Sequence, residues 1–96
     1  MYKVGDLVRI KKREGDCHDY PLSYVDGMLD YQEVIAKVIE VEYDDEAERY
    51  KDLKYYDGDN YIYYLDVTNS EYLWSSSMLE PYVTNSHFVD LNNILR

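Results

Sequence analysis

The sequence predicts a mainly β protein that folds as one small domain. Apolar and polar residues alternate in residues 32–43 and again in residues 60–67, as in strands whose two faces meet different surroundings. After a polar turn, a further strand carries Trp74, the only tryptophan, where a small sheet needs its largest core side chain. The chain has 96 residues, which is enough for a single core but too few for two domains.

Residues 4–12 form the first expected strand, in which Gly5 and Asp6 mark a bend or a bulge. A basic run of Lys11, Lys12 and Arg13 follows directly. Such a run usually lies at a solvated strand end, where it offsets nearby acids. The alternative is a contact patch for an anionic partner.

Residues 14–31 are expected to form a long loop. Within it, Val25, Met28, Leu29 and Tyr31 have the spacing of one helical turn that covers an open end of the fold. Four potential metal ligands stand in a row at residues 16–19, but neighbouring side chains rarely converge on one ion. Adjacent Cys17 and His18 also lack a third residue to orient them as a nucleophile and base. We therefore expect no metal, no cofactor and no catalytic site.

Residues 32–43 give the clearest strand. Val34, Ala36 and Val38 alternate with Ile35 and Lys37, and the alternation changes phase near Glu40. A phase change within a long strand predicts a bulge or a sharp bend, which closing a small sheet requires.

An acidic loop, residues 44–59, comes next. Residues 40–59 hold nine acidic and three basic residues, a net charge of −6. Asp44 could cap a short helix with Ala47, Tyr50 and Leu53 on one side, but the Tyr-rich composition and the turn signal at Asp57-Gly58 favour an extended hairpin. Calcium binding by Asp57, Asp59 and Asn60 is disfavoured because the EF-hand ligand spacing is absent.

The remaining residues complete the sheet and add a tail. Residues 75–81 predict a tight turn, residues 82–84 a strand end, and residues 85–96 a helix that packs on the domain or faces a partner. The helix would place four apolar side chains on one stripe, namely Phe88, Leu91, Ile94 and Leu95. The expected core of residues 1–84 consists of Leu7, Val8, Ile10, Val38, Ile39, Leu65, Trp74 and Leu79.

Three segments together resemble the landmarks of small SH3-like barrels of five to six antiparallel strands, which are frequent in short bacteriophage and mobile-element proteins. The segments are Val4 to Ile10, then Met28 to Tyr31 with Ala36 to Ile39, and finally Tyr72 to Pro81. The resemblance covers roughly residues 3–83. It implies a single barrel with a long first loop, and it places the chain near inhibitors of bacterial defence systems such as anti-CRISPR proteins.

Charge and composition limit the possible partners. The net charge is −10, and the only cysteine excludes an intramolecular disulfide. A field of this sign repels nucleic acid and anionic membranes over most of the surface. No apolar stretch approaches the length of a membrane span. We therefore expect a cytoplasmic protein, a monomer or weak homodimer, that contacts neither nucleic acid nor membrane directly.

We expect the protein to bind a partner and not to catalyse a reaction. The sequence shows no set of His, Lys, Ser or Cys residues, at separated positions, that could form a catalytic cleft with the carboxylates. Carboxylates on one strand face lie about 6.7 Å apart, comparable to successive phosphates. An acidic body with exposed tyrosines could thus occupy the basic groove of a host-defence nuclease. The alternatives are an adaptor that binds protein through Trp74 and exposed tyrosines, and a nucleic-acid-binding barrel that uses Lys11 to Arg13. The expected binding residues are Glu40, Glu42, Asp44, Asp45, Glu46, Glu48, Asp52, Tyr55, Tyr56, Asp57 and Asp59.

Overall fold

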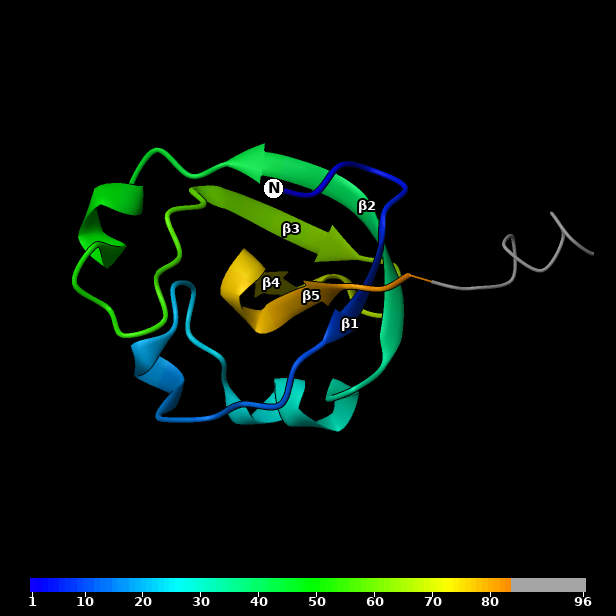
Figure 1. Ribbon diagram of the computed structural model, residues 1–96, viewed down its shortest axis with the longest axis horizontal. Coiled ribbons are helices and arrows are strands. Elements are labelled where there is room, and N and C mark those ends of the chain that lie inside the picture. The colour runs from blue at the N-terminus through cyan, green and yellow to red at the C-terminus, as the bar shows by residue number, and fades with distance from the viewer. Residues whose placement is uncertain (84–96) are drawn as a thin grey trace, which may run out of the picture.

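The computed structural model describes residues 1–83, which form one antiparallel sheet of five strands in the order β4-β3-β2-β1-β5 (Figure 1). The mainly β prediction is confirmed, whereas the predicted helix at residues 85–96 lies outside the described residues. The strands are β1 (Leu7–Ile10), β2 (Ile35–Tyr43), β3 (Tyr61–Leu65), β4 (Asn69–Trp74) and β5 (Leu79–Pro81). Short 3-10 helices connect them: η1 (Cys17–Asp19), η2 (Asp26–Tyr31), η3 (Ala47–Tyr50) and η4 (Ser76–Met78).

Strand β2 joins the two halves of the sheet. Its first half pairs with β1, its second half pairs with β3, and the pairing shifts between Val38 and Glu40. The predicted phase change near Glu40 is therefore a real irregularity. The bend predicted at Gly5 is also present, because Gly5 has a φ of 98° and its N–H donates to the Val38 carbonyl at 2.8 Å.

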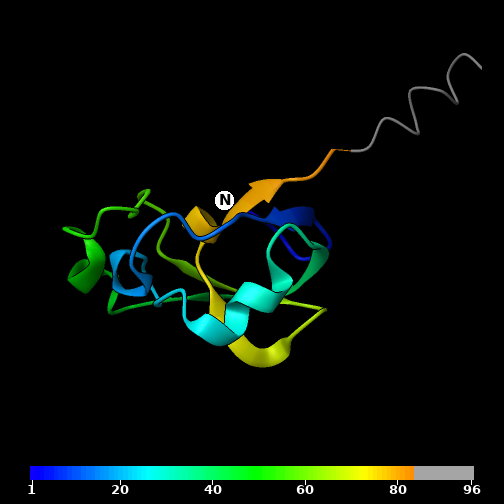
Figure 2. The same cartoon turned by 90° about the horizontal axis from the view of Figure 1, so that it is seen from below.

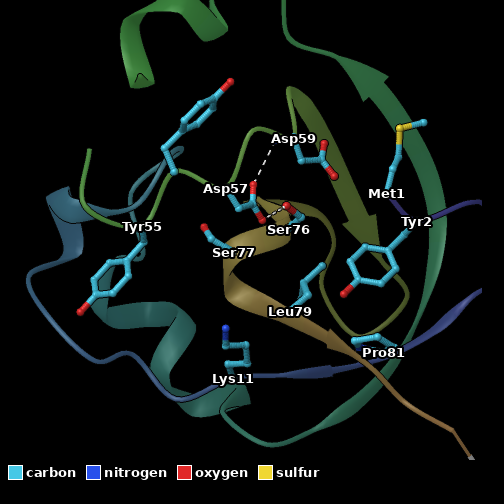
Figure 3. A pocket seen from close by; sticks show the side chains of 11 residues that line it. Met1, Tyr2, Lys11, Tyr55, Asp57, Asp59, Ser76, Ser77, Leu79 and Pro81 are labelled. Carbon is cyan, nitrogen blue, oxygen red and sulfur yellow. Dashed lines mark hydrogen bonds between the residues drawn. The ribbon is translucent and has the colours of Figure 1, made fainter. Parts of the chain in front are cut away.

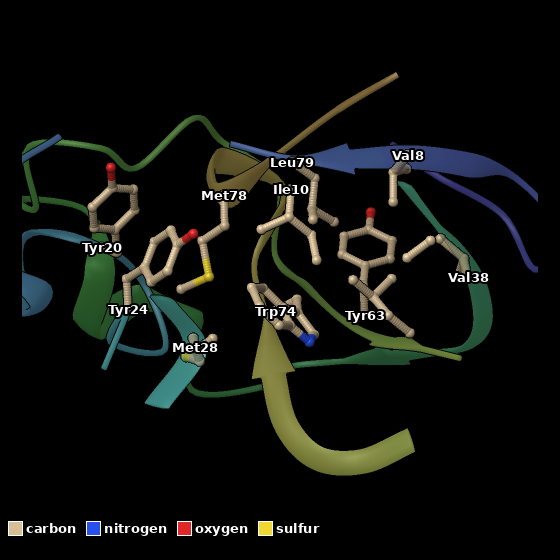
Figure 4. Close-up of a cluster of buried hydrophobic side chains, with 12 residues drawn as sticks. Val8, Ile10, Tyr20, Tyr24, Met28, Val38, Tyr63, Trp74, Met78 and Leu79 are labelled. Atoms are coloured by element: carbon tan, nitrogen blue, oxygen red, sulfur yellow. The ribbon is translucent and has the colours of Figure 1, made fainter. Parts of the chain in front are cut away.

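The core lies on the inner face of the bent sheet (Figure 4). Six of the eight predicted core residues are buried there: Val8, Ile10, Val38, Leu65, Trp74 and Leu79. The prediction is wrong for Leu7 and Ile39, which are exposed. Leu7 precedes the inward-facing Val8 and so points outward, and Ile39 lies at the register shift on the outer face. The predicted core left out several buried side chains, among them Tyr20, Tyr24, Tyr63 and Met78.

The loop between β1 and β2 covers one end of this core, as predicted. Helix η2 buries Met28, and the Tyr24 hydroxyl donates to the Lys11 carbonyl at 2.6 Å. The lid fits closely, because a Cβ on Gly27 would stand 2.2 Å from the Tyr72 hydroxyl oxygen. Burial fixes the loop although most of it has no regular structure.

The acidic loop is not the extended hairpin that the sequence favoured. It contains the short 3-10 helix η3, which includes Ala47 and Tyr50 of the helical alternative but ends before Leu53. Asp44 does not cap this helix, because its carboxylate accepts from the N–H of Glu46, the residue before the helix, at 2.9 Å. The turn at Asp57-Gly58 is present, with a φ of 89° at Gly58. Figures 1 and 2 place η1 and η3 at the same end of the molecule, where the two long loops meet.

Candidate partner-binding groove

An open groove of about 650 Å³ lies between the end of the acidic loop, helix η4 and the N-terminus (Figure 3). Tyr55, Tyr56, Asp57 and Asp59 line it, so the structure brings four of the eleven predicted binding residues to one place. They meet because the acidic loop returns along η4 before it enters β3.

Asp57 and Asp59 are held in place by hydrogen bonds. The Asp57 carboxylate accepts from the Ser76 hydroxyl and from the Asp59 N–H, the latter at 3.1 Å. Asp59 accepts from the Tyr63 hydroxyl at 2.6 Å and from the Tyr61 N–H at 2.9 Å. Asp59 therefore anchors the buried Tyr63 as well as lining the groove. Burial of the Tyr63 ring, followed by this hydrogen bond, raises the pKa of Tyr63.

The two tyrosines present rigid, half-buried rings. Tyr55 stacks on Tyr20 with ring centroids 4.4 Å apart, and its N–H donates to the Asp19 carbonyl at 3.1 Å. The Tyr56 hydroxyl donates to the Asn60 side chain at 2.6 Å. Rings that are fixed before binding lose little entropy when a partner covers them.

The groove also contains residues outside the predicted binding set. Tyr2 lies opposite Tyr55, and the side chain of Lys11, which follows β1 and belongs to the basic run, reaches toward Ser77 (Figure 3). They come from segments far from the acidic loop, so no local pattern could have identified them.

The other predicted residues lie outside the groove. Asp45, Glu46 and Asp52 are exposed on the acidic loop, where Glu46 pairs with Arg49 at 3.2 Å, and Glu48 belongs to η3. Glu40 and Glu42 lie on the outer face of β2, where Glu42 accepts from the Tyr64 hydroxyl at 2.8 Å. The predicted carboxylates are therefore divided between the acidic loop and the outer face of β2, and they do not form a single row.

The basic run is largely neutralised by neighbouring carboxylates. Lys12 lies 3.6 Å from Glu33. Arg13 lies 3.0 Å from Asp26 and also donates to the Tyr24 carbonyl at 2.9 Å. The surface that a nucleic-acid-binding barrel would use therefore carries little net positive charge.

The residue 16–19 segment forms a helical turn. The Asp16 carboxylate accepts from the His18 N–H at 3.4 Å, and partial burial raises the pKa of the Cys17 thiol. Among residues 1–83, no group of three or more His, Cys, Asp or Glu side chains is placed to hold a metal ion. A raised pKa disfavours the thiolate form that a nucleophile or a metal ligand needs.

We expect chelators to leave the thermal midpoint unchanged, and Cys17→Ser to leave both the midpoint and partner binding unchanged. The measurement is a thermal melt with and without a chelator, alongside metal analysis after gel filtration. Retention of one zinc ion per chain would contradict this expectation.

Comparison of the chain with protein-family models, with curated proteins and with solved structures finds no match. None of the helices in residues 1–83 has the length and apolar character needed to span a membrane.

Proposed function

We propose that the chain is a small acidic module that binds a basic nucleic-acid-handling protein, a host-defence nuclease, and blocks its nucleic-acid groove. The observation that carries this proposal is the clustering of exposed carboxylates on the acidic loop beside the tyrosine-lined groove. Charge would accelerate encounter with a basic surface, and the rings would supply buried area.

The arrangement of elements supports an SH3-like barrel as the scaffold. A long loop follows β1, the bent β2 contributes to both halves of the sheet, and a 3-10 helix precedes the last strand. We infer that the outer strands β4 and β5 approach each other to complete the barrel. Functional loops then gather at one end of a rigid body, as is common for such scaffolds.

The adaptor alternative is favoured by the groove itself, which offers fixed aromatic rings and hydrogen-bonding groups to a peptide. Trp74 is fully buried, so an adaptor surface would use the tyrosines without it. The nucleic-acid-binding alternative is weakened by the ion pairs at Lys12 and Arg13.

Charge reversal on the acidic loop tests the proposal. The variant Glu46→Lys, Glu48→Lys, Asp52→Lys should bind an RNA-guided nuclease with an association rate about ten- to a thousandfold lower, because electrostatic steering is lost. Added salt should reduce the wild-type association rate more than it changes dissociation, since the Debye length is about 8 Å at physiological ionic strength. The measurement is competition with labelled DNA or guide RNA for the nuclease.

A matched control carries the same change of charge elsewhere. Glu14, Asp30 and Glu71 are exposed acids outside the acidic loop, and their replacement by lysine should leave inhibition close to that of the wild type. Equal inhibition by the wild type and the loop variant would overturn the proposal and leave the adaptor function. An equal loss of inhibition in the loop variant and the control variant would show that inhibition depends only on the net charge of the protein.

A further inference from the structure

The second half of β2 has an edge that no other strand of residues 1–83 covers. Strand β1 pairs with β2 only as far as Leu7 opposite Lys37, and the backbone hydrogen bonds that follow end at Val38. Strand β3 lies along the opposite side of β2 as far as Tyr43. Residues 39–43 therefore have a neighbouring strand on one side only, and β2 runs along the rim of the molecule there (Figure 1). Here we call residues 39–43 the open edge.

The backbone groups of Val41 and Tyr43 point toward this open edge. The Asp44 N–H donates to the Asn60 carbonyl at 2.9 Å, which fixes the phase of the ladder between β2 and β3. Hydrogen-bonded pairs alternate along an antiparallel ladder, so every second residue before Asp44 bonds to β3. The N–H and C=O groups of Val41 and Tyr43 face the other way, and within residues 1–83 they have no hydrogen-bond partner.

The N-terminal segment does not cover the open edge. It turns before β1, where the Asp6 N–H donates to the Lys3 carbonyl at 3.0 Å. The Tyr2 N–H donates to the Tyr63 hydroxyl at 3.2 Å, and the two rings meet edge to face with centroids 5.5 Å apart. Because Tyr63 is fully buried in the core, the N-terminal segment lies over the inner face of the sheet.

The edge of β5 is protected in a way that the open edge is not. The Tyr82 N–H donates to the Leu7 carbonyl, so the neighbouring Pro81 has its nitrogen on the side away from β1, where it offers no N–H to another strand. Proline and lysine are residues that commonly prevent an edge from pairing with another chain. The open edge contains neither, and it can therefore accept a further strand.

The side chains of the open edge determine which strand fits. Glu40 and Glu42 are exposed on the outer face, about 6.7 Å apart from a rise of about 3.3 Å per residue. A strand with Lys or Arg at alternate positions would place a cation opposite each of them, and opposite charges across a ladder are stabilising. On the inner face, Tyr43 is 59% exposed and borders an open hollow of about 350 Å³, which Tyr61 and Asp59 also line. This leaves room for the residue between the two cations.

A second copy of this chain fits the open edge poorly. In the antiparallel registers that join Val41 and Tyr43 to the same residues of a second copy, Glu42 lies opposite Glu40, Glu42 or Asp44 of that copy. Like charges directly opposite each other destabilise a ladder. The open edge thus disfavours self-association and favours a basic strand.

We propose that the open edge binds an extended, basic segment of another protein, which adds to the sheet as a strand antiparallel to β2. Its main chain bonds to Val41 and Tyr43, and its alternate Lys or Arg side chains face Glu40 and Glu42. The main-chain hydrogen bonds supply affinity and the alternate side chains supply specificity. The open edge is separate from the groove, so this interaction goes beyond the proposed function and can fail while that function stands.

Amide NMR of the full-length protein with a synthetic peptide tests the proposal. The probe is a short peptide of alternating Lys and Val with blocked termini. We expect chemical-shift changes centred on residues 39–43 and slower amide hydrogen exchange at Val41 and Tyr43. Two control peptides should not bind at the open edge. One has Glu in place of Lys, and the other keeps its charges but carries N-methyl groups on the valines, whose N–H groups would bond to β2.

Protein variants separate the backbone from the charges. Tyr43→Pro removes an edge N–H but no hydrogen bond to β3, and it should weaken peptide binding about three- to tenfold. The matched control Tyr43→Ala keeps the N–H and should retain most of the affinity. Glu40→Gln combined with Glu42→Gln should weaken binding about two- to thirtyfold. The Val8 and Leu65 amide resonances report whether each variant keeps its core.

Three results would overturn the proposal. In the first, the peptide does not bind, or its N-methylated form binds equally well. In the second, the shifts are centred on Tyr55 and Asp57 in the groove. In the third, the Val41 and Tyr43 amides are already protected without peptide, which would mean that the chain itself or a second copy covers the open edge. The wild-type spectra alone distinguish these results, so a variant that fails to fold does not prevent a decision.

Discussion

Replacement of Trp74 by alanine is expected to remove much of the stability of the chain, so that the variant unfolds at far lower denaturant concentration than the wild type. The side chain is fully buried, its ring meets Tyr24 and Tyr72 at centroid distances of 6.0 and 6.4 Å, and its indole N–H donates to the Thr68 hydroxyl at 3.0 Å. Truncation of a buried tryptophan typically costs about 3–5 kcal/mol, against a total stability of about 5–15 kcal/mol for a small domain.

Trp74→Phe provides the graded control. It keeps much of the aromatic volume but removes the hydrogen bond to Thr68, so the loss should be smaller, about 1–3 kcal/mol. Circular dichroism during denaturant titration measures both variants. A cooperative transition for Trp74→Ala at the wild-type midpoint would show that the core is organised around other residues.

Alkaline pH should destabilise the protein through tyrosines whose pKa is raised in the fold. For the buried Tyr24, burial, with a smaller contribution from Tyr20, raises the pKa to about 12. For Tyr64, which is only half-buried, the hydrogen bond to Glu42 raises the pKa to about 12. Because the folded state holds these protons more tightly than the unfolded state, their contribution to stability is complete below about pH 10. It is lost as the pH rises through 12. For Tyr24, a shift of about two pH units corresponds to about 3 kcal/mol.

The measurement combines thermal melts between pH 8 and 12 with tyrosinate absorbance. Part of the increase in tyrosinate absorbance should occur only at the high end of the pH range, together with unfolding. Tyr24→Phe should reduce the loss of stability between pH 8 and 12. Asp59→Asn should lower the pKa of Tyr63, because its carboxylate otherwise raises it. Ionisation of all tyrosines in a single step near pH 10 with the fold intact would contradict this account.

The strands were predictable because they depend on local pattern. The alternation of apolar and polar residues identified β2 and β3. The change in the phase of this alternation near Glu40 located the register shift in β2. The same shift explains the error at Ile39, since a single extra residue exchanges the two faces of a strand. Leu7 was misassigned for a related reason, because a four-residue strand gives too few positions to decide which face is buried.

The tyrosines were harder to place. A hydroxyl group favours the surface unless a partner is available, and the partners of Tyr24 and Tyr63 are Lys11 and Asp59, which are 13 and 4 residues away in the sequence. The groove could be predicted only in part, for the same reason. Tyr55, Tyr56, Asp57 and Asp59 form a local cluster in the sequence, whereas Tyr2 and Ser76 join them only through the fold.

The pairing of β5 with β1 has a consequence for how the chain is made. Val8 lies opposite Pro81, more than seventy residues later in the sequence. During translation the first strand therefore emerges from the ribosome long before the strand that covers its edge. Contacts between distant residues also slow folding, because the intervening chain must be closed first. We expect the sheet to be completed after residue 81 has left the exit tunnel, and until then the edge of β1 is open to chaperones.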